Sequence, residues 1–567
     1  MIGLLAFFPG ILLGMLISQI LEAVLLNMFG LPYMLHLGFS LPALGLTFLY
    51  FSAMLLFSIR KNGKWICRVQ LRDLLYYDRK TENSSVSGNI SAVSIFLLSV
   101  FCCVAGFLLI CIQPLGKGYD ILVGIVFLLL FLFGFFISTS AFLVTYFGNR
   151  SDWKYRKQRL ITFRDFTGKI HSTSTVMGIL SILFMLAITF GGIGTTVGLM
   201  AARNVEASAF DVLILHPGEQ YDFSRYETII QKSFPLQSHT YEIYTGGKTD
   251  FLSVHDQTIV EAGRSVHRTY AEFEYDTYMA YSDYLKLREM LGYQSLELDP
   301  ALCYVHCVPA LEKSFKELIR KQDGLKCAGY SFATDGIFSE PFSQTNDYGN
   351  GADYVIIVPD HAVSQMQIVY SVYAAKTQTP LSPSDIQSII ADCGSLTLLE
   401  RMSAKTASSG APTAFMYEDM DYLSGKWADK AEFSYLYAMV ICLFYLAFIL
   451  EISAAAILAT QVLSDWQEKQ RQDRILRQLG MNEQLVYKLN NRQLLLLFLF
   501  PIFPSLLLSG CFISICAKKI LVLFFELPPT PDFLLIGQSL GISLVLFALI
   551  YGVYFVAAQI CYEHRRK

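Results

Sequence analysis

The chain has 567 residues, of which 53% are hydrophobic and only 16% are charged, and its mean hydropathy is +0.43. The formal net charge is −3 at pH 7. Soluble globular proteins rarely show such a balance, so this composition excludes a protein whose main solvent is water.

Eight stretches carry about 20 or more largely apolar residues, the length that crosses roughly 30 Å of hydrocarbon. Each is predicted to be a helix, because only a helix satisfies its own backbone hydrogen bonds in lipid. The first stretch lacks a basic leading segment and contains Glu22, so we interpret it as a retained span and not as a cleaved signal. The expected spans are 3–29, 38–59, 91–113, 119–147, 177–200, 433–463, 491–517 and 534–560.

Lysines and arginines are concentrated in the connections at 60–90, 148–176 and 464–490, and at the C-terminal end. Such residues stay on the cytoplasmic side of a membrane, so these segments and both termini are predicted to be cytoplasmic. The pair Lys518 and Lys519 is the one exception. Three regions follow: an N-terminal transmembrane region at 1–202 with five spans, an extracellular domain at 203–432, and a C-terminal transmembrane module at 433–567 with three spans.

The segment 203–432 is acidic, with 18 Lys and Arg against 32 Asp and Glu, a net charge of −14, whereas the rest of the chain carries +11. An acidic exterior attracts cationic ligands, although the same charge also keeps a surface soluble. Periodicity predicts mixed secondary structure. Strands are expected at 211–215 and 354–358, and helices at 282–291, 311–321 and 384–392. The fold class is therefore a polytopic α-helical membrane protein with about eight transmembrane helices and a large mixed α+β extracellular domain.

Rings and carboxylates alternate in RTYAEFEYDTYMAYSDY, which ends at Tyr284. Such a stretch can hold a cationic peptide by charge and by cation–π contact. The candidate peptide-binding residues are Glu272, Glu274, Asp276 and Tyr278. The alternative is an edge strand with one half-buried face.

Cys303, His306 and Cys307 have a spacing near that of zinc ligands. No second close pair completes a tetrahedral set, so we predict no metal site. A disulfide is permitted outside the cell. Pairings among Cys303, Cys307, Cys327 and Cys393 cannot be distinguished from sequence, so the disulfide state stays open.

Signatures of catalysis are missing from the sequence. It contains no phosphate-binding loop, because GGIGTTVG at 191–198 lacks the lysine and lies inside an expected span, where glycines serve helix packing or a helix end. Hydrolase, metalloprotease and kinase motifs are absent as well. We therefore expect no catalytic residue, no directly bound cofactor, no enzymatic activity and no nucleic-acid partner.

The segment 464–493 follows the sixth expected span and predicts a charged helix, a break near Gly480 and a second helix that enters the membrane. Its cationic face suits docking onto a soluble partner. The alternative is a solvated loop held to anionic lipid. The face combines Arg471, Arg474 and Arg477 with Leu476 and Leu479.

Two carboxylates, Glu22 and Glu451, lie within expected spans. Ionisable groups there are costly and usually face a helix bundle or a cavity. Each is interpreted either as functional or as satisfied by a nearby hydroxyl, for which Ser453 is the candidate beside Glu451.

The stretch ILRQLGM, Ile475–Met481, is followed by the apolar QLLLLFLFPIFPSLL. Together they resemble the C-terminal half of FtsX-like ABC transporter permeases, in which this cytoplasmic turn contacts the ATPase. The layout of spans around one large outer domain is similar to the bacitracin-export (Bce-type) subfamily of Gram-positive bacteria. That family has ten spans and two coupling turns, so the first two spans and the first turn are not represented here. Three explanations stay open: another chain supplies these segments, the sequence is truncated, or the protein is a degenerate copy.

The resemblance implies a bacterial plasma-membrane protein that works with a homodimeric ATPase subunit, where Mg-ATP is bound and hydrolysed. It implies ATPase-coupling roles for Arg471, Arg474, Leu476, Arg477, Leu479, Gly480 and Met481. The implied activity is removal or export of cationic antimicrobial peptides, bacitracin or lantibiotic-like, from their membrane lipid target, which confers resistance. Members often work with a membrane histidine kinase. The alternatives are a peptide-sensing scaffold for such a kinase and a permease that extracts lipoproteins or other amphiphiles.

Overall fold

The computed structural model describes most of the chain, and it divides into two compact units. One unit comprises Met1–Gly192, Ile441–Ile515 and Ile542–Lys567, and the other comprises Ile193–Val440 and Cys516–Gly541. The described residues are 2–28, 41–66, 89–112, 119–148, 159–219, 222–233, 235–245, 249–261, 276–297, 299–321, 324–327, 330–342, 353–393, 421–432, 434–464, 466–524 and 532–564.

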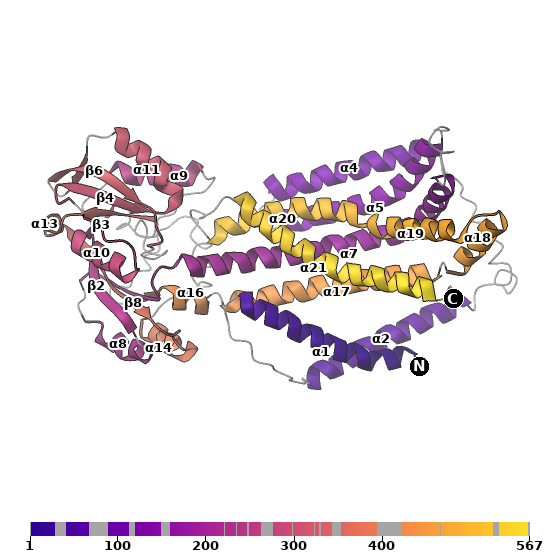
Figure 1. Ribbon diagram of the computed structural model, residues 1–567, viewed down its shortest axis with the longest axis horizontal. Helices are drawn as coiled ribbons and strands as arrows, with labels where there is room; N and C mark the ends of the chain where they lie inside the picture. The colour runs from indigo at the N-terminus through magenta and orange to yellow at the C-terminus, as the bar shows by residue number, and fades with distance from the viewer. Residues whose placement is uncertain are drawn as a thin grey trace. The chain divides into compact units, whose positions relative to one another are not determined.

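Long helices account for the first unit, and four of them, α7, α17, α20 and α21, continue into the second. The longest, α7, runs from Arg159 to Ala207 without interruption. Figure 1 shows these helices with their labels. The others are α1 (Ile2–Met28), α2 (Leu41–Ile66), α4 (Asn89–Ile112), α5 (Tyr119–Gly148), α17 (Ser434–Ser464), α18 (Trp466–Gln478), α19 (Glu483–Leu499), α20 (Ile502–Phe524) and α21 (Asp532–His564).

Within the described ranges, seven helical segments are long and apolar enough to cross a membrane. They confirm seven of the eight expected spans and indicate a membrane-embedded protein. The eighth, expected at 3–29, forms the helix α1, in which the described residues give the apolar segment Phe7–Ile20; this span stays a prediction. The confirmed segments are Leu44–Lys61, Val93–Ile112, Tyr119–Thr139, Thr173–Arg203, Met439–Gln461, Glu483–Lys518 and Leu534–Ala557.

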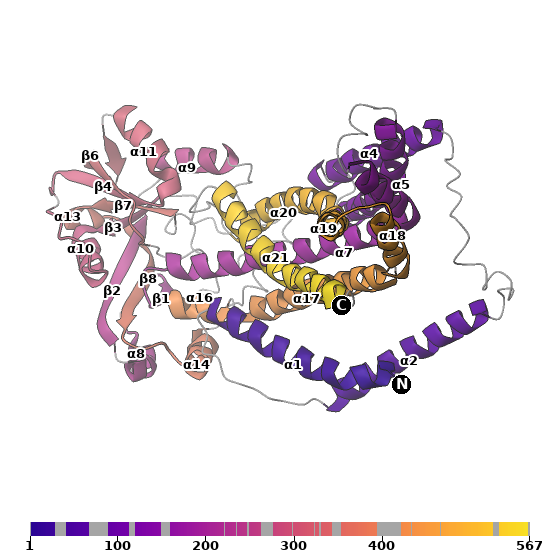
Figure 2. The same cartoon turned by 45° about the vertical axis from the view of Figure 1, so that its right-hand side comes forward.

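Small residues let the membrane-length helices approach closely. The helices α4 and α5 lie side by side (Figures 1 and 2), and a Cβ added at Gly124 would lie 2.9 Å from the Gly106 carbonyl oxygen. On α7, a Cβ at Gly192 would lie 2.3 Å from the Ile513 side chain of α20. The glycine run at 191–198 thus packs helices, which is one of the two readings expected of it.

Replacing Gly124 by alanine is expected to lower the free energy of unfolding by about 1–3 kcal/mol, because the Gly106 backbone cannot move away from the added methyl group without separating α4 from α5. The measurement is the melting temperature of the purified full chain in detergent. Gly510→Ala is the matched control, since a Cβ at Gly510 meets no atom within 4 Å. Equal melting temperatures for both variants would contradict the close packing.

Serine hydroxyls form hydrogen bonds between α7 and α20. Ser181 of α7 donates to the Pro501 carbonyl at 2.6 Å, and Ser505 of α20 donates to the Ser181 carbonyl at 2.8 Å. One turn further on, Ser509 donates to the Met185 carbonyl at 2.9 Å. These serines are fully buried. The hydroxyls therefore fix the register of α20 along α7.

The second unit contains a nine-stranded mixed sheet, counted over the described residues, in the order β5-β6-β4-β7-β3-β2-β8-β1-β9. We call the part of this unit that holds the sheet the sheet domain (Figure 2). The pairs β3–β7 and β4–β6 are parallel, and the other pairs are antiparallel. The strands are β1 (Val212–Pro217), β2 (Pro235–Thr245), β3 (Thr277–Ala280), β4 (Leu302–Cys307), β5 (Leu325–Cys327), β6 (Tyr330–Phe338), β7 (Tyr354–Val358), β8 (Gln367–Thr377) and β9 (Tyr422–Ser424).

Helices cover both faces of this sheet. One face packs against α10 (Tyr281–Met290), whose Tyr284 and Leu287 are fully buried with Met279 of β3. The other face carries two separate cores. One lies beneath α9 (Asp250–Glu261) and α11 (Pro309–Lys321), and the other lies beneath α8 (Ser224–Ile230), α14 (Pro383–Cys393) and α16 (Lys426–Glu432). The two predicted strands and three predicted helices are confirmed within one or two residues at each end.

Candidate functional site

A helical hairpin occupies the segment in which sequence placed the ATPase-coupling residues. Helix α18 ends in a turn where Gly480 has φ +90°, a conformation that a side chain disfavours. The Gly480 amide donates to the Arg477 carbonyl at 3.0 Å, and the Met481 amide donates to the Leu476 carbonyl at 3.1 Å. This pair of bonds is a Schellman cap. Asn482 then caps α19 by accepting from the Gln484 amide, so the predicted helix, break and second helix are confirmed.

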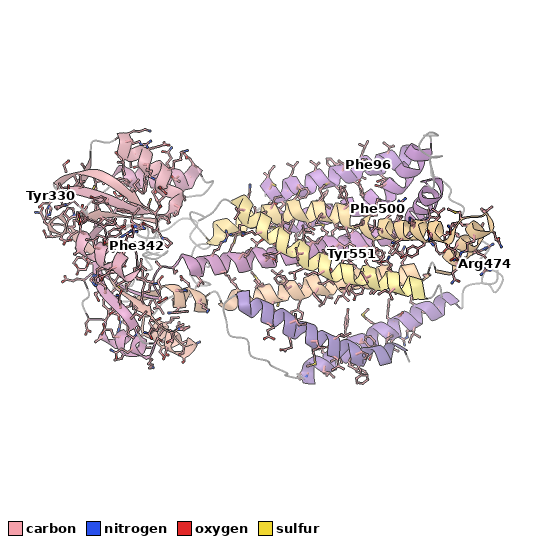
Figure 3. The ribbon with its side chains drawn as sticks, viewed as in Figure 1. Phe96, Tyr330, Phe342, Arg474, Phe500 and Tyr551 are labelled. Carbon is pink, nitrogen blue, oxygen red and sulfur yellow. The ribbon has the colours of Figure 1, made fainter. Side chains whose placement is uncertain are left out.

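The end of the hairpin presents apolar side chains among arginines. Leu479 is 77% exposed, Ile475 48% and Leu485 40%. Arg471 and Arg474 are also exposed, and Figure 3 labels Arg474 on α18. Leu476 and Met481 are only partly buried and belong to the cap that shapes the turn. We call Ile475, Leu479 and Leu485 the hairpin ridge; two of its three members, Ile475 and Leu485, were not among the predicted coupling residues.

Polar bonds hold the two arms of the hairpin together. The Asn490 side-chain amide of α19 donates to both carboxylate oxygens of Asp473 on α18, at 3.0 and 2.8 Å. Lys469 donates to Gln493 in the same interface. Asn490 and Lys469 are buried, and Arg477 lies 3.4 Å from Glu483 across the turn. Because hydrogen bonds are directional, these pairs set one register between α18 and α19.

A break separates α19 from α20 at Phe500 and Pro501, inside what sequence predicted as a single span. Hydroxyl groups of other helices bond to carbonyls on both sides of it. The Tyr551 hydroxyl of α21 donates to the Phe498 carbonyl at 3.1 Å, while Ser181 of α7 donates to Pro501. Phe136 of α5 packs edge-on against Phe500, with ring centroids 5.3 Å apart. Figure 3 labels Phe500 and Tyr551 in the helical unit.

The two carboxylates predicted within spans have different surroundings. Glu451 on α17 is 4% exposed, and its Oε1 atom has no hydrogen-bond partner among the described groups. The expected Ser453 partner is wrong, because that hydroxyl donates to the Ile449 carbonyl of its own helix at 2.7 Å. The backbone of Tyr551 on α21 is a neighbour of the Glu451 carboxyl. Glu22 on α1 is half-buried.

Two of the four predicted peptide-binding residues are not accessible. Asp276 and Tyr278 are fully buried. Asp276 accepts from the Thr249 amide at 2.5 Å and from the Tyr354 hydroxyl at 2.6 Å. Strand β3 also lies between β7 and β2, so the edge-strand alternative is wrong too. Glu272 and Glu274 lie outside the described residues.

The residues considered for zinc lie on opposite faces of β4. Cys303 and Cys307 face the core under α9 and α11, whereas His306 contacts Tyr284 of α10 on the other face. Both thiols are free, and among the described residues no group of three His, Cys, Asp or Glu is placed to hold a metal. The side chains of Cys327 and Cys393 lie outside the described set.

His306 is instead part of the core. Burial lowers the pKa of His306 to about 4, so the ring is neutral at pH 7. Its Nε2 donates to the Glu340 carbonyl at 2.7 Å, and Nδ1 accepts from the Tyr284 hydroxyl at 2.7 Å. Both ring nitrogens are satisfied, which explains how a histidine that is 4% exposed is accommodated.

Comparison of the chain with models of known protein families and with curated proteins finds no match. The choice of the hairpin as the candidate site therefore rests on its geometry and not on a relative. Sequence reasoning found the hairpin, because glycine, asparagine and the charged helix are local signals. It missed the Tyr551–Phe498 bond, which joins residues 53 positions apart in the chain.

Proposed function

We propose that this chain is the membrane subunit of an ABC transporter and that the hairpin ridge docks onto a separate, homodimeric ATPase subunit. The observation that supports the proposal most directly is the hairpin itself. Its exposed ridge lies at the end of two helices that lead into the membrane-length helices α17 and α20. A movement imposed on the hairpin is transmitted through these helices.

The chemistry of the hairpin favours a protein groove as its binding partner. Three apolar side chains on two successive helices are costly to leave in water, and they match the way in which an amphipathic helix enters a hydrophobic groove. Arg471, Arg474 and Arg477 surround the ridge, so the complementary rim is acidic. ATP binding is assigned to the partner, because this sequence lacks a phosphate-binding loop.

The proposed cargo is a cationic antimicrobial peptide that is removed from its lipid target in a bacterial plasma membrane. The support is the net charge of −14 on residues 203–432, which attracts cations. In the proposed orientation both termini are cytoplasmic and the sheet domain is extracellular, as the basic connections predict. Asp276 and Tyr278 have no part in binding, since they are buried.

The hairpin contact is tested by placing a photo-crosslinking residue at Leu479 in living cells and identifying the captured protein by mass spectrometry. The expected product is a protein with nucleotide-binding motifs of the ABC type. Arg474→Glu and Leu479→Asp are each expected to reduce its co-purification about tenfold, and resistance to a cationic peptide is expected to fall with it.

Arg60→Glu is the matched control, because it makes the same charge reversal at an exposed position of α2, outside the hairpin. Equal co-purification in all variants would contradict docking at the hairpin. Capture of a histidine kinase without an ATPase would favour the sensing scaffold.

A further inference from the structure

One carboxyl group lies in the middle of a membrane-length helix. Glu451 is at the centre of the apolar segment Met439–Gln461 of α17 and is the only charged side chain in that segment. It is 4% exposed, and its Oε1 atom is buried without a hydrogen-bond partner among the described groups. The buried residues that follow it on α17 are Ala454, Ala455 and Leu458. Glu451 therefore belongs to the face that α17 buries in the helical unit.

Three helices meet one turn before Glu451. A Cβ added at Gly191 of α7 would lie 3.0 Å from the Ser543 hydroxyl oxygen of α21 and 4.0 Å from the Ala447 Cβ of α17. Ala447 precedes Glu451 by four residues, which is about one turn of helix. The carboxyl is thus placed where α17 packs against α7 and α21.

Apolar groups surround this position. The backbone of Tyr551 on α21 is a neighbour of the Glu451 carboxyl. The Tyr551 ring packs edge-on against Phe184 of α7, with centroids 5.0 Å apart, and stacks on Phe547 at 5.6 Å. Figure 3 labels Tyr551 in the helical unit. Such surroundings do not solvate a charge.

The neighbouring helices supply no cation for Glu451. On α7 no charged residue occurs between Thr173 and Met200, and on α21 none occurs between Leu534 and Ala557. Arg203 of α7 bonds to Gln538, which lies about 20 Å along α21 from Tyr551. The other titratable side chains are Cys442 and Tyr445 on this segment of α17, Tyr551 and Tyr554 on α21, and Glu22 on α1, which contacts α17 through Ser18. None of them carries a positive charge.

An ionised carboxylate in an apolar bundle without a cation is strongly disfavoured relative to the neutral acid. We propose that Glu451 is a proton-binding site. The carboxyl keeps its proton while α17 is packed against α7 and α21, and it gives the proton to water when these helices separate. Because a carboxyl in water is ionised at neutral pH, loss of the proton favours the separated state. The inference concerns the helical unit alone and does not depend on an ATPase partner.

The bound proton is tested by the infrared spectrum of the full chain at pH 7 in a detergent without ester groups. A protonated carboxyl has a C=O stretching band that an ionised carboxylate lacks. This band is expected in the unsubstituted chain and is expected to be lost in Glu451→Gln. Asp222→Asn is the control: it removes an exposed carboxyl, which is ionised at pH 7, so the band is expected to stay.

The link to helix packing is tested by hydrogen–deuterium exchange of the backbone amides of residues 445–458. The unsubstituted chain and Glu451→Gln are compared at the same pH, so the effect of pH on the exchange chemistry cancels. At pH 5 both side chains are neutral, and the rates are expected to agree within about twofold. At pH 9 the unsubstituted chain is expected to exchange about fivefold faster. Glu451→Leu, a second neutral variant, is expected to exchange at the same rate relative to Glu451→Gln at both pH values.

Two further variants separate Glu451 from the other titratable groups. With Glu22→Gln or Tyr551→Phe in place, the faster exchange at pH 9 is expected to persist. An infrared band that survives Glu451→Gln unchanged would overturn the inference, and so would equal exchange of the unsubstituted chain and Glu451→Gln at pH 9. These comparisons need no substitution at Tyr551, so they decide the question even if Tyr551→Phe does not fold.

Discussion

Replacing Asp421 by alanine is expected to lower the free energy of unfolding of the sheet domain by about 3–5 kcal/mol, because it removes a buried carboxylate from three partners. Asp421 is 3% exposed and directly precedes β9. One oxygen bonds to His216 Nδ1 of β1 at 2.6 Å. The other accepts from Arg225 and from the buried Tyr226 hydroxyl, both on α8.

The full chain is titrated with denaturant, and unfolding of the sheet domain is followed by the oxidation of Met279 and Met290 with hydrogen peroxide. Both methionines are buried in the core beneath α10, so they oxidise only when the sheet domain opens. Asp222→Asn is the control, as it removes a carboxylate charge from an exposed position just before α8. A midpoint for Asp421→Ala that equals the control would show that the three bonds contribute little.

The stability of the sheet domain is expected to be greatest near pH 6.5 and to fall on both sides, because two buried histidines titrate in opposite directions. Burial of His255 opposes its charge, but its contacts with Asp256 and Asp353 outweigh this and raise the pKa of His255 to about 9. The His255 Nε2 to Asp353 Oδ2 distance is 2.8 Å. His306 behaves in the opposite way, since burial lowers its pKa to about 4.

The direction of each pH effect follows from the difference between the pKa in the folded chain and the pKa in the unfolded chain. A raised pKa means that the stabilisation by His255 is complete below pH 6.5 and is lost as the pH rises through 9. A lowered pKa means that the stabilisation by neutral His306 is complete above pH 6.5 and is lost as the pH falls through 4. Each of these two pKa differences corresponds to about 3 kcal/mol at full extent.

The methionine oxidation titration, repeated at pH values from 4 to 9, measures both losses of stability. The loss above pH 6.5 is the alkaline arm, and the loss below pH 6.5 is the acid arm. His255→Gln is expected to flatten the alkaline arm and to leave the acid arm intact. His306→Gln is expected to weaken the acid arm while the alkaline arm persists. An alkaline arm that is unchanged by His255→Gln would show that the contacts with Asp256 and Asp353 do not hold the charge.

Local signals in the sequence were enough for several of the elements. Apolar length predicted the helices that contain Val93–Ile112 and Leu534–Ala557, because a membrane span requires only continuous hydrophobicity. The hairpin at 464–493 was found because a Schellman cap is written in consecutive residues around Gly480. The strand Tyr354–Val358 followed from an uninterrupted apolar run.

The polar residues of greatest interest depended on tertiary structure. Alternating rings and carboxylates indicated either a peptide-binding surface or an edge strand for Asp276 and Tyr278, yet pairing of β3 between β7 and β2 buries both. Ser453 is the sequence neighbour of Glu451, but the group beside that carboxyl is Tyr551, one hundred residues later. Asp421 likewise meets His216 across 205 residues of chain.

By itself the sequence determined the membrane-length helices, two of the strands and the capped turn, because backbone geometry and hydrophobic length are set by neighbouring residues. Only the tertiary structure decided which polar groups are buried and which hydroxyl donates to which carbonyl. Those outcomes depend on the distance between segments far apart in the chain, and no local pattern of residues encodes that distance.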